Sequence, residues 1–157
     1  MNLQVGETMK VWMELALAQA ILAAAKGEVP VGAVIVRDGR LIASAHNEKE
    51  ALQDVTAHAE LLAMRRANAL LGSWRLDNCE LYVTLEPCAM CAGTIAASRL
   101  KRLVYGAMDV KCGGIESNYQ LLSPNIYGGT IEIYSGIMEE ECRELLSGFF
   151  AERRQVK

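Results

Sequence analysis

Two short motifs, far apart in the chain, constrain its fold more than any other feature. His58-Ala59-Glu60 supplies an imidazole and a carboxylate, and Pro87-Cys88-Ala89-Met90-Cys91 supplies two thiols. One imidazole and two thiolates suit Zn²⁺ and leave a fourth coordination position open, as in catalytic rather than structural zinc sites. Any fold of this chain therefore has to bring residues 58 and 88–91 together around one metal ion.

Both motifs are expected at helix starts. Cys88 and Cys91 are three positions apart, so their sulfur atoms project from one face of a first helical turn. The free N–H groups and the dipole of that turn favour thiolates. Glu60 follows His58 by two positions, about 200° around a helix, so it does not easily share the metal with His58. It is expected to face the substrate as a base that accepts a proton from metal-bound water.

Four further residues that could bind a metal or a proton are interpreted as structural. Glu86 precedes Pro87 in a turn and is expected to accept hydrogen bonds from helix-terminal N–H groups. His46 lies at a strand end without a partner cysteine and is interpreted as a loop residue, not as a fourth ligand. Cys112 and Cys142 are expected to be small buried hydrophobic residues.

The length, cysteine content and net charge of the chain indicate its domain number, its compartment and its possible partners. A chain of 157 residues predicts one domain, residues 1–157, that buries roughly 70% of its unfolded surface. Five scattered cysteines without a secretory segment indicate the cytoplasm, with two of them on metal. No apolar run is expected to span a membrane. The net charge of −3 is unhelpful to nucleic-acid binding, and the basic residues near 99–102 and 153–157 are interpreted as solvated surface.

Hydrophobic periodicity predicts an α/β fold with three layers, in which helices cover both faces of a five-stranded mixed sheet. In the first helix the inward stripe is predicted to be Val11, Leu15, Ala18, Leu22 and Ala25. A turn at Asp38-Gly39 joins the first two strands. Segment 106–129 is expected to be irregular, with one short helical piece near 119–122. The predicted helices are 9–26 and those beginning near 57, 87 and 139; the predicted strands are 31–36, 41–45, 80–85, 102–105 and 130–134.

The two motifs together match H-x-E…P-C-x-x-C, the signature of zinc nucleobase deaminases. With their flanks they resemble the bacterial tRNA-specific adenosine deaminases of the cytidine-deaminase-like superfamily. The resemblance runs from about residue 9 to the C-terminus. It is carried by segments 28–34, 46–47, 56–60, 73–76, 84–93, 106–109 and 145–150.

This resemblance implies one Zn²⁺ per chain, held by His58, Cys88 and Cys91, with Glu60 shuttling protons. The implied substrate is the wobble adenosine of a tRNA anticodon stem-loop, and the implied assembly is a cytoplasmic homodimer. The residues implied to contact the flipped nucleoside and its neighbours are Asn47, Val29, Pro30, the backbone of Ala59, and Asp109. Phe149 and Arg153 are implied to brace the anticodon loop.

Two departures from the family concern regions that face RNA. Asn125-Ile126-Tyr127-Gly128-Gly129 stands where the family has an Asn-His stretch, and Ala151 and Glu152 make the last helix less basic. Two alternatives therefore stay open beside tRNA editing. One is a deaminase of a free nucleobase or nucleoside, which the acidic net charge favours. The other is a non-catalytic RNA-binding module with structural zinc, against which Glu60 argues.

Overall fold

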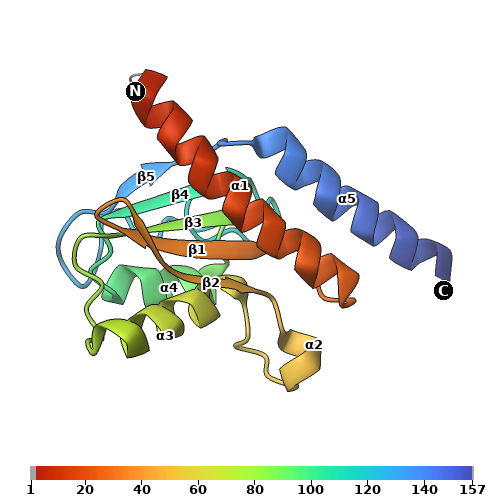
Figure 1. Ribbon diagram of the computed structural model, residues 1–157, viewed down its shortest axis with the longest axis horizontal. Helices are drawn as coiled ribbons and strands as arrows, with labels where there is room; N and C mark the ends of the chain where they lie inside the picture. The colour runs from red at the N-terminus through yellow and green to blue at the C-terminus, as the bar shows by residue number, and fades with distance from the viewer. Residues whose placement is uncertain (1–2, 157) are drawn as a thin grey trace.

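The computed structural model describes residues 3–156 and has three layers, with one sheet between two pairs of helices (Figure 1). The sheet order is β2-β1-β3-β4-β5. β1 pairs antiparallel with β2 and β3, while β3, β4 and β5 run parallel. The predicted mixed five-stranded sheet is confirmed. In chain order the elements are α1 (Leu3–Ala25), β1 (Gly32–Arg37), β2 (Arg40–His46), α2 (Lys49–Leu52), α3 (Ala59–Leu71), β3 (Cys79–Leu85), α4 (Ala89–Ala97), β4 (Arg102–Ala107), β5 (Glu132–Tyr134) and α5 (Glu139–Val156).

Each face of the sheet has its own apolar core, as the two-residue period of strands requires. On β1, Ala33 and Ile35 belong to the core under α3 and α4, whereas Val34 and Val36 belong to the core under α1 and α5. Because both faces are covered, the strand is buried almost throughout and reads as a continuous apolar run. The sequence therefore located this strand correctly.

The buried face of α1 is not the predicted one. Met9, Met13, Ala16, Ala20 and Ala23 face the sheet. The large apolar residues of the predicted stripe are exposed instead, Val11 at 54% and Leu22 at 47%. A Cβ atom built on Gly32 would lie 2.0 Å from the Ala16 carbonyl oxygen, so helix and strand approach at backbone distance. Only small side chains fit between them, and the larger ones point outward.

Other sequence predictions also need correction. The first helix begins at Leu3, six residues earlier than predicted. Segment 119–122 has no regular structure at its first two residues and a turn at its last two, and not a helical piece. The polar segment after β2 contains the short helix α2. α1 is long and apolar enough to cross a membrane by length and composition alone, contrary to the prediction, although core helices of soluble proteins meet the same test. Its inner face packs against β1.

Candidate active site

The two motifs meet at the N-termini of two helices. His58 is the N-cap residue of α3 and Cys88 is the N-cap residue of α4, and both have extended backbone conformations. N-cap side chains commonly accept hydrogen bonds from the first helical turn. Neither His58 nor Cys88 does so. Both side chains are therefore available for another partner.

These two side chains, together with Cys91, form a group that could bind a metal ion. His58, Cys88 and Cys91 place one ligand atom each within 4.8 Å of one another. The Nδ1 atom of His58 lies 3.7 Å from Cys88 Sγ and 3.5 Å from Cys91 Sγ. Bonds of about 2.0 Å to nitrogen and 2.3 Å to sulfur in a tetrahedron would give N···S distances of roughly 3.6 Å. The spacing of the ligand atoms therefore fits a tetrahedral metal ion.

The two thiols of the group have pKa values shifted in opposite directions. A hydrogen bond from Cys91 is the main cause that lowers the pKa of Cys88 to about 3. The same hydrogen bond, together with burial, raises the pKa of Cys91 far above its ordinary value. The hydrogen bond with Cys88 also raises the pKa of His58. Metal binding requires thiolates and a neutral imidazole, so loading this site would release protons.

Glu60 lies beside the metal-binding group without joining it. Its side chain is on the first turn of α3 and only 4% of the residue is exposed. Burial raises the pKa of this carboxyl group, because a charge is poorly solvated there. It lines the same cavity as His58 and Cys88. A carboxyl group with a raised pKa next to a metal site is suited to accept and return a proton.

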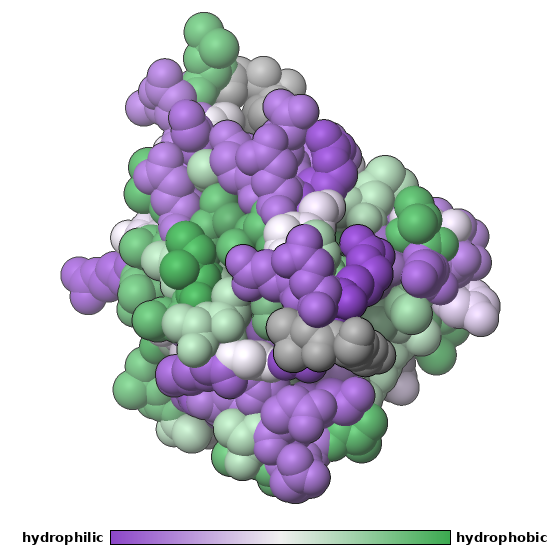
Figure 2. All heavy atoms as spheres, turned by 90° about the vertical axis from the view of Figure 1, so that its right-hand side faces the viewer, coloured by the Kyte–Doolittle hydropathy of each residue, from purple (hydrophilic) through white to green (hydrophobic). Residues whose placement is uncertain are grey.

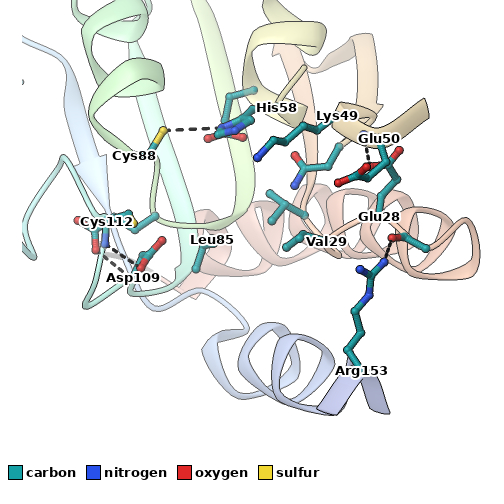
Figure 3. Close-up of a pocket in the computed structure, with 15 residues that line it drawn as sticks. Glu28, Val29, Lys49, Glu50, His58, Leu85, Cys88, Asp109, Cys112 and Arg153 are labelled. Atoms are coloured by element: carbon teal, nitrogen blue, oxygen red, sulfur yellow. Dashed lines mark hydrogen bonds between the residues drawn. The ribbon is translucent and has the colours of Figure 1, made fainter. Parts of the chain in front are cut away.

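The cavity encloses about 290 Å³ and opens between α2, the C-terminal end of α1 and α5 (Figure 3). This volume is close to the lower end of the range of about 300 to 1,000 Å³ for ligand pockets, so the cavity suits a small heterocycle and not a larger ligand. Among the predicted nucleoside contacts, Val29, Asn47 and Asp109 line this cavity. Pro30 is buried and does not line the cavity.

Ala59, the remaining predicted contact, is fully buried. Its backbone N–H donates to the Asn47 side-chain oxygen, with an N···Oδ1 distance of 2.8 Å. The Ala59 amide is therefore occupied, and it ties Asn47 to the start of α3. The Asn47 side chain keeps its Nδ2 donor for a ligand in the cavity.

One wall of the cavity is organised by Glu86. Its carboxylate accepts hydrogen bonds from the backbone N–H groups of Asp109, Ile115, Glu116 and Ser117. Burial opposes ionisation, but the Ser117 hydroxyl and these N–H groups outweigh it and hold the pKa of Glu86 below its ordinary value. The prediction that Glu86 binds N–H groups is confirmed. However, the donors belong to the segment after β4 and not to a helix terminus, because that loop folds back over the strand end.

Three cavity residues were missed or misplaced by the sequence analysis. Glu28 is 3% exposed and its carboxylate accepts N–H bonds of 2.9 and 2.8 Å from Glu50 and Ala51, which fastens α2 to the turn after α1. Lys49 of α2 also lines the cavity.

The prediction that Cys112 is buried is wrong: it is exposed and lines the cavity. Segment 109–117 carries it to the surface. Cys142 is buried, as predicted.

The residues predicted to face RNA lie along α5. Arg153 lines the cavity, donates a hydrogen bond to the Gly27 carbonyl and sits 4.7 Å above the Phe149 ring. A larger groove of about 820 Å³ adjoins the cavity and is lined by Phe150 and Arg154 rather than by Phe149. Figure 2 views the side of the molecule where α2 and the C-terminal ends of α1 and α5 lie, and hydrophilic residues prevail at its centre.

Comparison with known proteins places this site in a family. The family described as MafB19-like deaminase matches residues 7–154. The tRNA-specific adenosine deaminase of Bacillus subtilis (strain 168) is 46% identical over 148 residues, covering 94% of this chain and 92% of that protein. That of Agrobacterium fabrum (strain C58 / ATCC 33970) is 48% identical over 143 residues, covering 91% and 94%. The chain belongs to the tRNA-specific adenosine deaminase family.

Solved structures agree with this placement. A structure from a study of A-to-I editing by tRNA:A34 deaminases at the wobble position superposes with a TM-score of 0.83 and 48% identity, covering 86% of this chain and 98% of that one. The guanine deaminase from Nitrosomonas europaea has a TM-score of 0.80 at 25% identity, covering 90% and 84%. The fold is therefore shared with a free-base deaminase, whereas the sequence is closer to the tRNA enzymes.

Proposed function

We propose that this protein hydrolyses adenosine to inosine at the wobble position of a tRNA anticodon. The observation that carries the proposal is the site itself: a metal-binding group of His58, Cys88 and Cys91 with the buried carboxyl of Glu60 beside it, in one small cavity. Relatives named tRNA-specific adenosine deaminases, 46% and 48% identical over more than nine-tenths of the chain, support the substrate.

The proposed cofactor is one Zn²⁺ per chain, held by His58 Nδ1 and the two cysteine sulfurs. Sulfur and nitrogen ligands at tetrahedral spacing favour zinc over magnesium or calcium, which prefer oxygen. When bound, zinc would lower the pKa of a coordinated water molecule to about 7. The three protein ligands leave a position for that water, which a closed structural site would lack.

The protein residues supply binding and proton transfer. The Asn47 amide and the Val29 side chain are proposed to hold the extruded base in the cavity, with the base excluding water as it enters. Glu60 accepts a proton from the attacking water and delivers one to N1 of the purine. It then accepts the second proton of that water from the oxygen now bonded to C6 and passes it to the C6 amino group, which leaves as ammonia and gives inosine. A base of this kind contributes typically 10²–10⁴-fold to a rate.

The flanking nucleotides are proposed to lie along α5 and the loop after β4. Asp109 lines both the cavity and the adjoining groove, where Lys111 and Arg154 provide positive charge. Arg153 and Phe149 are proposed to brace the anticodon loop from this helix. The acidic net charge of −3 makes such local cations necessary, since phosphate binding depends on positive charge.

The test is inosine formation in an anticodon stem-loop with adenosine at the wobble position, measured by mass spectrometry. Free adenine, guanine, cytosine and their nucleosides are incubated in parallel. Conversion of the stem-loop alone, with an affinity that falls steeply as salt rises, is the expected result. Conversion of a free base with the stem-loop untouched would refute the proposal and favour the guanine deaminase relationship.

We also propose a homodimer in the cytoplasm. Large apolar side chains are exposed on α4 and beyond the end of α3, Met90 at 36% and Trp74 at 63%, and a second copy would cover them. All five cysteines are free, which accords with a reducing compartment. The expected mass by light scattering is twice that of the chain, and Trp74→Glu should lower it; a monomeric wild-type protein would contradict the dimer.

A further inference from the structure

His46 is a buried histidine that the proposed chemistry does not use. The interpretation of His46 as a loop residue is wrong: it is the last residue of β2 and is 6% exposed. Its Nδ1 atom lies 2.8 Å from the Asn47 carbonyl oxygen, and its Nε2 atom lies 3.2 Å from the Lys26 ammonium nitrogen. Both ring nitrogens therefore have partners, and the ring is held between the C-terminal end of α1 and the end of β2.

These two contacts select one tautomer. A lysine ammonium group has only donors, so Nε2 of His46 has to accept the hydrogen bond from Lys26. The proton of the neutral ring then lies on Nδ1 and is donated to the Asn47 carbonyl oxygen. Lys26 thus secures the donor that His46 presents to Asn47.

Asn47 directly follows β2 and is hydrogen-bonded both to Val31, the residue before β1, and to Ala59, the first residue of α3. Its backbone N–H donates to the Val31 carbonyl, at an N···O distance of 3.1 Å. Its side-chain oxygen accepts the Ala59 N–H at 2.8 Å. With the bond from His46, its N–H, its carbonyl oxygen and its side-chain oxygen are all fixed, while the side chain lines the cavity.

We propose that His46, held in one tautomer by Lys26, is a positioning residue that aims the Asn47 amide at the target base. The inference rests on the proposed function, because it concerns base recognition in the same cavity. His46 does not line that cavity, so it acts through Asn47. It sets the affinity for the base and leaves the metal ligands and Glu60 unchanged.

Two substitutions of His46 distinguish its hydrogen bond to the Asn47 carbonyl from its packing in the same space. The Nδ2 of asparagine occupies the place of a histidine Nδ1, so His46→Asn keeps a donor for the Asn47 carbonyl. The amide of glutamine reaches the place of Nε2, so His46→Gln leaves that carbonyl without its donor. We expect His46→Gln to raise the KM for the stem-loop roughly fivefold to tenfold, as for one lost hydrogen bond, with kcat and zinc content unchanged.

His46→Asn should stay within about twofold of the wild-type KM. Equal KM values for all three proteins would overturn the proposal. So would equal losses in both variants, or a fall in zinc content, since those outcomes indicate a packing role or an effect on the metal site. Lys26→Met, which removes the ammonium group, should raise KM in the same direction by a smaller factor.

The tautomer provides a readout that is independent of activity. The chain has two histidines, so ¹⁵N NMR of the zinc-loaded protein resolves one ring of each kind. We expect the proton on Nδ1 in His46 and on Nε2 in His58, whose Nδ1 faces the two sulfurs. A His46 proton on Nε2 would overturn the proposal. A wild-type enzyme inert on the stem-loop would refute the proposed function, and the NMR result would still decide the His46 arrangement.

Discussion

Glu86→Gln is expected to destabilise the protein severely, although it replaces one side chain with another of nearly the same shape. Glu86 is 1% exposed. One carboxylate oxygen accepts the N–H groups of Ile115, Glu116 and Ser117 at 3.2, 2.9 and 2.9 Å, and the other accepts the N–H of Asp109 at 3.1 Å. The wall of the cavity after β4 depends on these bonds.

The cost follows from the acceptors that glutamine lacks. If its oxygen takes the three-donor position, each of those bonds changes from a charged to a neutral acceptor, a loss of about 1 kcal/mol each. Its NH₂ group then faces the Asp109 N–H, and this unsatisfied donor costs about 1–3 kcal/mol. The sum is about 4–6 kcal/mol. At roughly 2–4 °C per kcal/mol for a chain of this size, Tm should fall by at least about 8 °C.

Thermal unfolding followed by circular dichroism measures this loss, with Glu144→Gln on the exposed side of α5 as the control. The pKa of Glu86 is depressed in the folded protein. The stabilisation is therefore complete above the unfolded pKa of about 4.3 and is lost as pH falls through the lower folded value. The difference between wild type and variant should shrink over that acidic range. A variant Tm within about 2 °C of wild type at pH 7 would refute the reasoning.

Three further outcomes are expected. Glu60→Gln should retain zinc by elemental analysis while turnover falls about 10²–10⁴-fold; a near-normal rate would remove Glu60 from its role. Hydrogen bonding with Cys88 and burial raise the pKa of Cys91, so zinc binding should release protons and should weaken as pH falls. Calorimetric heats of zinc binding that do not depend on the buffer would contradict this. Gly32→Ala should lower Tm, because its Cβ atom would lie 2.0 and 2.5 Å from backbone atoms of α1. The control Gly148→Ala in α5, whose Cβ atom would have nothing within 4 Å, should leave Tm unchanged. Similar Tm values for the two variants would show that α1 moves away freely.

The first helix shows where sequence reasoning reaches its limit. Its existence follows from local composition, and it was predicted. The predicted buried face is wrong because the largest apolar residues of this helix do not face inward. Whether they do depends on the distance between helix and sheet. That distance is set here by Gly32 on a different element, which no helical period records.

The sequence by itself predicted that His58, Cys88 and Cys91 come together as a group that could hold a metal ion, the order of the strands along the chain, and the parallel β3–β4 unit with its helix between. These depend on residue chemistry and on short-range periodicity. Only the tertiary structure decided that Glu28 fastens α2, that Glu86 holds the wall after β4, and that Cys112 opens into the cavity. Each of these is a contact between residues distant in the chain. A buried carboxylate finds its N–H partners only when the fold brings those backbone groups to it.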